Sequence, residues 1–151
     1  MKNLLMTFFM AMVPVIELRG AIPYGVGVAE LSVETATFVS IVGNLVPIPF
    51  LIVFTRDVFS WLRKKSEKLN ILVCRMEKKA ESKKDVVLRY EFLGLMILVA
   101  IPLPGTGAWT GALVAAMMNM RLQRAMPAIT VGVIIAGCIV SWLTYGVSKL
   151  F

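Results

Sequence analysis

The chain alternates long uncharged apolar runs with one strongly charged stretch. A hydrocarbon core takes roughly 20 helical residues to cross. Three runs without a charged residue reach that length, namely residues 35–55, 92–120 and 125–148. A fourth run, residues 3–29, is as long but carries Glu17 and Arg19 near its middle. The pattern predicts bilayer-embedded helices joined by short turns.

The composition agrees with this pattern. Of the 151 residues, 58% are apolar and 17% are charged, whereas an average soluble domain is about 45 to 50% apolar and about 25% charged. A water-soluble fold is therefore not expected, and the length fits one domain. We predict an all-α integral membrane protein in which residues 1–151 form a single multi-pass domain of the plasma membrane.

Most of the charge lies in residues 56–91, which hold eleven of the sixteen basic residues and six of the nine acidic ones. Basic loops stay in the cytoplasm, so this segment is predicted to be cytoplasmic, and the net charge of +7 does not indicate a nucleic-acid partner. Apolar residues recur in it at helical spacings, namely Trp61, Leu62, Leu69, Leu72, Val73, Met76 and Ala80. The segment is either an amphipathic helix on the inner leaflet or a solvated helical linker.

The halves on either side of the charged segment repeat the same order of elements. Each has an apolar stretch interrupted by Pro and Gly, followed by an uncharged apolar helix. Pro102 and Pro104, followed by Gly105 and Gly107, must interrupt any helix over residues 92–120. Non-helical backbone at membrane depth is tolerated only where it is buried in protein or lines a wet cavity, because unpaired N–H and C=O groups in lipid cost several kcal/mol each.

A re-entrant hairpin, which dips into the bilayer and returns, meets this condition. We predict two such hairpins and two transmembrane helices, at residues 3–29 and 92–120 and at residues 33–55 and 125–148 respectively. The hairpins are expected to turn near residues 17–23 and 102–107. Each half then makes one net crossing, so the halves form inverted repeats with the charged segment between them.

Loop charges favour hairpins over four plain spanning helices. The turn after the first hairpin carries Glu30 and Glu34, and the turn after the second carries Arg121 and Arg124. Hairpins place the acidic turn outside and the basic turn inside, as the positive-inside rule requires. Four spanning helices would place the basic turn outside.

Two motifs carry a family resemblance. Glu17-Leu-Arg-Gly-Ala-Ile-Pro23 and Pro102-Leu-Pro-Gly-Thr-Gly-Ala-Trp-Thr-Gly111 resemble the paired motifs of the small multi-drug export protein family, over essentially the whole chain. That family is similar, more distantly, to the DedA superfamily. The DedA resemblance implies two re-entrant loops and either proton-linked transport or lipid flipping.

The chain departs from the DedA pattern in both loops. Residues 104–111 contain no arginine, and no second acid matches near Pro23. Binding of an anionic lipid through an intramembrane arginine would therefore rest on Arg19 alone, which weakens a lipid-phosphate role.

Glu17 is the only acidic residue well inside an apolar stretch. A charge at the helix centre costs about 2.5 to 3.5 kcal/mol on insertion scales, so such residues line cavities, form pairs or carry ions. Burial disfavours the charged carboxylate and a nearby cation favours it, and a carboxylate balanced between the two can exchange a proton. We hypothesise that Glu17 is the proton or cation site and Arg19 its partner, in a wet cavity at the loop tips. The alternative is an ion pair that only ties the loop tips together.

Other candidate substrate- or ion-binding residues come from the two motifs and the helix between them: Gly20, Pro23, Asn44, Pro102, Pro104, Gly105, Thr106, Gly107 and Thr110. Thr106 and Thr110 offer hydroxyls, and the two glycines allow close backbone approach. Tight turns and close helix packing explain the glycines equally well. Asn44 either lines the cavity or pairs with backbone.

These features predict a secondary transporter, with proton-coupled export of a small molecule or drug as the first reading. A DedA-type lipid flippase or scramblase and a membrane scaffold or assembly protein are the alternatives. An enzyme is not expected, because the chain has no His and no intramembrane Asp pair. Neither a cofactor nor a metal is expected. The expected partners are membrane lipids, protons or small ions, the small-molecule or lipid substrate, and a second copy in a homodimer that shields the cavity.

Overall fold

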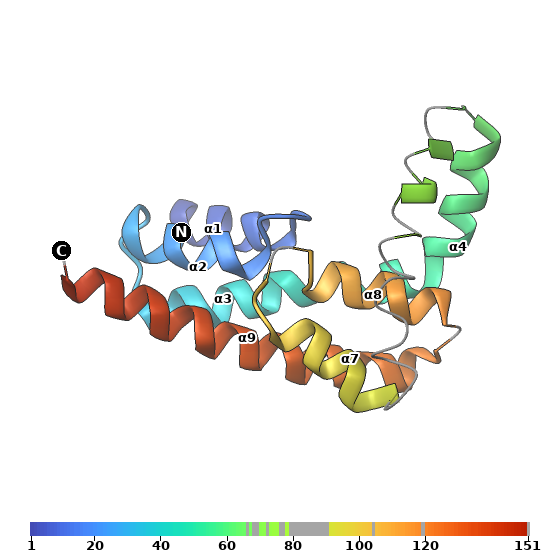
Figure 1. The fold of residues 1–151 in the computed structure, drawn as a ribbon. Coiled ribbons are helices and arrows are strands. Elements are labelled where there is room, and N and C mark those ends of the chain that lie inside the picture. The colour runs from blue at the N-terminus through green and yellow to red at the C-terminus, as the bar shows by residue number, and fades with distance from the viewer. Residues whose placement is uncertain are drawn as a thin grey trace.

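The computed structural model describes residues 1–65, 67, 70–71, 73–75, 78, 91–103, 105–118 and 120–150. These residues form helices and no strand, which confirms the predicted all-helical class. The helices are α1 (Lys2–Met12), α2 (Glu17–Gly27), α3 (Val33–Leu45), α4 (Ile48–Lys65), α7 (Glu91–Ala100), α8 (Ala108–Met117) and α9 (Leu122–Leu150), shown in Figure 1.

The first two helices form a short hairpin. Each has 11 residues, about 16 Å at 1.5 Å per residue, which is near half of a hydrocarbon core of about 30 Å. The hairpin turns at residues 13–16, so the prediction of a turn at residues 17–23 is wrong. Pro14 explains the difference, because the residue before a proline avoids the helical region and Val13 is extended. Pro23 instead lies inside α2.

The second hairpin has the same proportions. Helices α7 and α8 have 10 residues each, and the residues described between them, 101–103 and 105–107, are not helical. This is where the sequence places the break. The two hairpins point toward each other, since the turn of the first and the loop of the second meet in the middle of the molecule (Figure 1).

Two stretches are long and apolar enough to cross a membrane, Val33–Thr55 and Leu122–Gly146. Only 33% and 39% of their most apolar windows are buried inside the protein, so most of their side chains face outward. Exposed apolar surface on this scale fits contact with lipid. The first stretch bends at residues 46–47, and α4 then runs at a steep angle to α9 as far as Lys65 (Figure 1).

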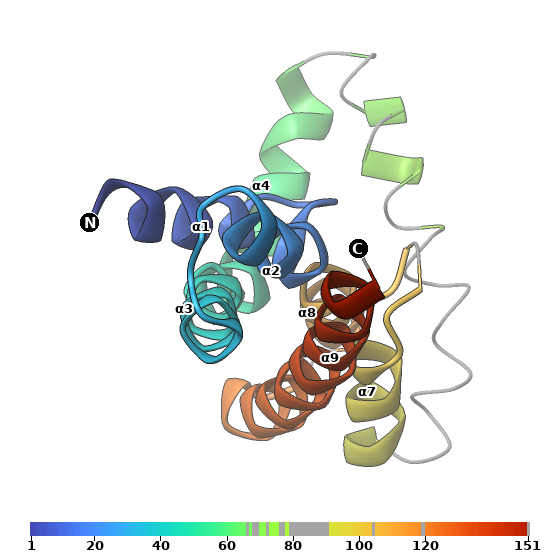
Figure 2. The ribbon, with the colours of Figure 1, turned by 90° about the vertical axis from the view of Figure 1, so that its left-hand side faces the viewer.

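Each hairpin packs on the long helix that follows it. Helices α1 and α2 contact α3, and α7 and α8 contact α9. The second helix of each hairpin also contacts the other half, because α2 touches α9 and α8 touches α4. Helices α3 and α9 run in opposite directions, and the hairpins open toward opposite ends of the molecule (Figures 1 and 2).

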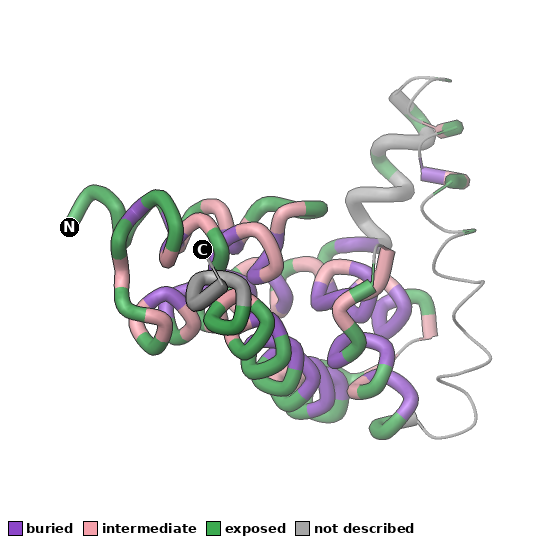
Figure 3. Tube along the Cα trace, turned by 60° about the vertical axis from the view of Figure 1, so that its left-hand side comes forward, coloured by how far each residue is buried: buried purple, intermediate pink, exposed green. Residues whose placement is uncertain are grey.

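The apolar core lies where the hairpins meet α9. Its largest fully buried side chains include Ile22 of α2, Leu95 and Val99 of α7, and Ile129 of α9. Figure 3 shows the buried face of α9 turned toward the hairpins and its exposed face turned away. The predicted amphipathic helix lies mostly outside the described residues, among which Trp61 is exposed and Val73 is buried.

Helices α7 and α9 approach closely at Gly132. A Cβ on Gly132 would lie 2.7 Å from Cβ of Val99 and 2.8 Å from the backbone oxygen of Met96. We expect Gly132→Ala to lower the free energy of unfolding by about 1 to 3 kcal/mol, because the core there has no room. Gly146→Ala in the same helix is the matched control, since its Cβ would meet nothing within 4 Å. Thermal unfolding in detergent, followed by tryptophan fluorescence, measures both, and equal shifts would contradict the close packing.

Candidate functional site

The carboxylate of Glu17 joins the two hairpins. Glu17 is the first residue of α2, is only 4% exposed and has a φ of 47°. Its Oε1 accepts a hydrogen bond of 3.1 Å from the backbone N–H of Trp109, in the first turn of α8. The first N–H groups of a helix have no partner within it, and the helix dipole places partial positive charge there. Glu17 therefore caps a helix of the other hairpin.

Arg19 makes the complementary contact. Its guanidinium donates to the backbone carbonyl of Leu103, to that of Ile101 at 3.5 Å, and to the hydroxyl of Thr106 at 3.0 Å. These groups follow directly on the C-terminal end of α7, where the helix dipole is negative. The first hairpin thus supplies both charges, and each meets a backbone end of opposite sign in the second.

Glycine is required where the carboxylate fits. Gly107 has a φ of 115°, and a Cβ there would lie 2.1 Å from Oε2 of Glu17. Gly105 has a φ of 87°. Residues other than glycine rarely adopt such angles. Both glycines therefore serve the loop, as the packing alternative in the sequence analysis proposed, and Gly107 in addition leaves space for Glu17.

The two candidate hydroxyls have partners within the loop. The Thr106 hydroxyl lies 2.6 Å from the carbonyl oxygen of Ile101 and 2.8 Å from that of Leu103, and it accepts from Arg19. The Thr110 hydroxyl donates to the carbonyl of Gly105 at 3.2 Å. In this structure both hydroxyls hold the loop in shape.

A narrow internal cleft lies beside this joint, with an empty volume of about 150 Å³ and too little width to hold a water molecule. It is lined by Glu17, Leu18, Arg19, Asn44, Val99, Gly107, Ala108, Val133 and Ala136. The side chain of Asn44 is fully buried, and neither its Oδ1 nor its Nδ2 has a hydrogen-bond partner among the residues that the structure describes. A buried polar group without a partner is costly.

The structure therefore brings four of the predicted residues together: Glu17, Arg19, Asn44 and Gly107. Gly20 and Pro23 lie further along α2, and a Cβ on Gly20 would lie 2.6 Å from Cγ2 of Ile16, in the turn before the helix. Pro102 lies in the loop but outside the lining of the cleft. Pro104 lies outside the described residues.

Trp109 is a site residue that the sequence analysis missed. Besides its backbone bond to Glu17, its indole Nε1 donates to the backbone oxygen of Met12 at 3.2 Å. It therefore ties the end of α1 to the start of α8. The available signal was its chemistry, because a tryptophan in an apolar stretch of small residues needs an acceptor for its N–H.

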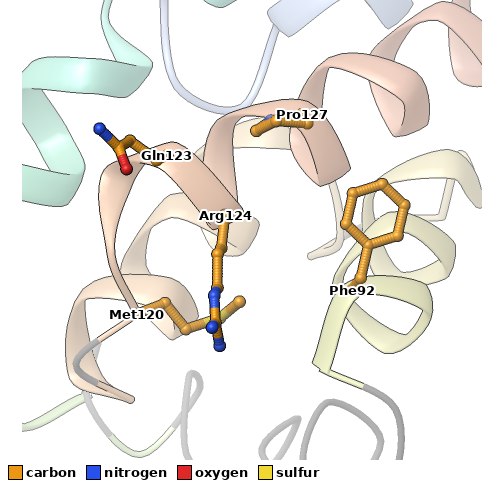
Figure 4. Close-up of a pocket in the computed structure, with 5 residues that line it drawn as sticks. All are labelled: Phe92, Met120, Gln123, Arg124 and Pro127. Carbon is orange, nitrogen blue, oxygen red and sulfur yellow. The ribbon is translucent and has the colours of Figure 1, made fainter.

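Two larger hollows lie outside this cleft. An apolar groove of about 410 Å³ is lined by Met12, Val46, Pro47, Phe50, Leu51, Phe54 and Thr55. A pocket of about 380 Å³ near the start of α7 is lined by Phe92, Met120, Gln123, Arg124 and Pro127. Figure 4 shows Arg124 beside Met120 and Gln123 pointing away from Phe92, so the polar groups of this pocket do not converge.

The indole bond gives a test of the joint. We expect Trp109→Phe to lower the free energy of unfolding by about 1 kcal/mol, the contribution of a typical hydrogen bond, because the carbonyl of Met12 loses its donor. Trp142→Phe is the control, since Trp142 is 75% exposed. Chemical unfolding in detergent measures both variants, and a Trp109→Phe protein as stable as the Trp142→Phe protein would contradict this role.

Comparison with known proteins identifies the family. The model of the family described as "Putative small multi-drug export protein" matches residues 17–139, which include Glu17, Arg19 and the whole second motif. No curated protein and no solved structure matches the chain. The matched region covers most of the 151 residues. The chain is therefore a membrane protein that belongs to the small multi-drug export protein family.

Proposed function

We propose that this protein is a secondary exporter of small amphiphilic molecules whose transport cycle is driven by protonation of Glu17. The observation that carries the proposal is the buried carboxylate of Glu17, which joins the tips of two half-length hairpins beside a central cleft. An ionisable residue at membrane depth marks an ion path more often than a packing site.

Re-entrant hairpins are part of this proposal. Helices of 10 and 11 residues reach about halfway through a hydrocarbon core, and the hairpins open toward opposite ends of the molecule (Figure 1). The opposite directions of α3 and α9 fit inverted repeats. The acidic turn with Glu30 and Glu34 would lie outside, and the basic turn with Arg121 and Arg124 inside.

A proton on Glu17 would change the contact between the hairpins. The ionised carboxylate accepts the Trp109 N–H at the positive end of α8. A neutral carboxyl group loses its attraction to this helix end and to Arg19, so the joint weakens. Proton binding would thereby favour separation of the hairpin tips and opening of the cleft, which is closed to water in this structure.

The apolar groove suggests the substrate class. It is lined almost entirely by apolar side chains of α4 and the bend before it, and it ends at Met12. The backbone oxygen of Met12 accepts from the Trp109 indole, so the groove adjoins the joint between the hairpins. A lipophilic molecule that enters from the bilayer could place its apolar body in the groove and a polar end near Glu17.

The lipid-flippase alternative receives less support. A flippase that recognises phosphate needs donors directed at the headgroup, but Arg19 already donates to two carbonyls and one hydroxyl. A scaffold role would leave the buried Glu17 without a purpose beyond the joint. Homodimer formation remains a prediction of the sequence analysis.

Topology is tested by the reactivity of single cysteines. In a Cys138→Ala background, we expect native Cys74 to react with a membrane-impermeant maleimide from the cytoplasmic side only. An introduced Gln123→Cys, with Cys74 replaced by serine, should react from the same side only. Glu30→Cys with Cys74 also replaced by serine should react only from outside. Reaction of Gln123→Cys from outside would indicate plain spanning helices and overturn the hairpin topology.

Coupling is tested by Glu17→Gln. Glutamine has the same shape and its oxygen can still accept from Trp109, so we expect an unchanged folded yield but loss of transport driven by a pH gradient. The measurement is flux of a panel of fluorescent lipophilic cations in proteoliposomes with an imposed pH gradient, alongside gel filtration of each variant.

Glu34→Gln is the matched control, because Glu34 is exposed in the first turn of α3. It should transport like the unmodified protein. Gradient-driven flux through Glu17→Gln equal to that of the unmodified protein would refute proton coupling at this residue, and the contact with α8 would then be structural only.

A further inference from the structure

Three helices meet along one seam that leads to the cleft. Helices α2, α3 and α9 contact one another pairwise. On α3, three polar residues follow at intervals of three and four, namely Thr37, Ser40 and Asn44, which places them on one face of the helix. Asn44, the innermost, lines the cleft together with Glu17 of α2 and Val133 of α9.

At the outer end of this row, the hydroxyl groups are partly exposed to solvent and have hydrogen-bond partners. Thr37 is half-buried, its hydroxyl donates to the carbonyl of Val33 at 2.6 Å, and it also contacts the hydroxyl of Ser141 on α9. Ser141 is likewise half-buried and lies 2.7 Å from the carbonyl of Gly137. The α2–α3 turn with Glu30 lies just beyond this end.

The inner part of the row is buried and unpaired. Ser40 and Asn44 are both fully buried, and within the described part of the chain neither the Ser40 hydroxyl nor either polar atom of Asn44 has a hydrogen-bond partner. Each such group costs on the order of 1 to 3 kcal/mol. Packing alone gives no reason to place unpaired polar atoms between an outer hydroxyl pair and the carboxylate of Glu17. Water is the partner that can satisfy them all.

The helices that form the seam pack closely through small residues, so small helix movements would be enough to open it. A Cβ on Gly25 of α2 would lie 2.8 Å from that of Ala36, and a Cβ on Gly137 of α9 would lie 2.9 Å from Ile41 Cδ1. Small residues let these backbones approach closely, and at Gly137 the neighbouring atom is the flexible end of the Ile41 side chain. The cleft is too narrow for water as it stands, and a modest separation of α9 from α2 and α3 would admit a single file.

We propose that the seam between α2, α3 and α9 is the route by which water and protons reach Glu17 from the end of the molecule that carries the α2–α3 turn. This rests on the proposed role of Glu17 as the proton site. Thr37 and Ser141 form the mouth, Ser40 the midpoint and Asn44 the last contact before the carboxylate. Seven residues of helix separate Thr37 from Asn44, a rise of about 10 Å. Among the residues that line the cleft, Arg19 is the other charged group that faces Glu17.

The route is tested by the entry of a small water-soluble thiol reagent. Single cysteines are placed at Thr37, Ser40 and Asn44 in a protein whose Cys74 and Cys138 are replaced. Intact cells and inverted vesicles are treated with 2-aminoethyl methanethiosulfonate, with free cysteine as scavenger on the far side. The protein is then denatured, and the remaining thiols are counted with a fluorescent maleimide. Ser40→Cys exchanges one atom and should fold normally.

We expect Thr37→Cys and Ser40→Cys to react from the face at which Glu30→Cys reacts, and not from the other. Val39→Cys is the matched control, because Val39 is 9% exposed and lies about 100° around the helix from Ser40. Ser40→Cys should react about tenfold faster than Val39→Cys, which corresponds to about 1.4 kcal/mol in the free energy of access. Reaction of Thr37→Cys without reaction of Ser40→Cys or Asn44→Cys would show a dry seam and overturn the route.

The labelling does not depend on transport, so the two proposals can fail separately. If Ser40→Cys is labelled and Glu17→Gln transports normally, the water route is supported and proton coupling at Glu17 is rejected. If Ser40→Cys is not labelled and Glu17→Gln is inactive, proton coupling at Glu17 is supported and the route along α3 is rejected.

Discussion

The structure depends on the contact between the two hairpin tips. The Glu17 carboxylate lies at the positive end of α8 and the Arg19 guanidinium lies at the negative end of α7. Backbone groups in lipid cost several kcal/mol each when unpaired, so hairpins that are re-entrant, as we propose, would be stable at membrane depth only if their tips satisfy one another. The first hairpin supplies the two charged side chains, and the second supplies mainly backbone groups. The loop of the second hairpin, residues 101–107, has glycines and no charged residue.

The same contact accounts for both the structural and the functional interpretation of Glu17. Burial of the Glu17 carboxylate costs hydration energy, and its hydrogen bond at the positive end of α8 offsets part of that cost. A joint of this kind is held firmly while both partners are present and is weakened when one loses its charge. Under the proposed function, tying the tips together and responding to a proton would be properties of one interaction, and the transport of a neutral Glu17 variant tests the second.

The sequence predicted the features that follow from local chemistry. Proline and glycine near residue 105 interrupt a helix whatever the tertiary structure is. Glu17 and Arg19 need polar partners in any fold that surrounds them with apolar residues. The position of the first turn was not predictable in the same way, because either Pro14 or Pro23 could end a helix, and in the structure only Pro14 lies at a turn whereas Pro23 lies inside α2. The role of Trp109 was hidden because its bond to Glu17 uses a backbone N–H that any residue offers.

Asn44 shows what only the three-dimensional arrangement reveals. An asparagine in an apolar helix is expected to find a partner, and the absence of one is visible only when every neighbour is placed. Since the cleft has no room for water, the unpaired amide makes this closed arrangement less stable than one in which the amide is hydrated. That difference favours opening of the cleft, and the ionised Glu17 contact opposes it. In the proposed cycle, a proton that weakens the Glu17 contact would remove this opposition, and the unpaired amide of Asn44 would then favour opening of the cleft.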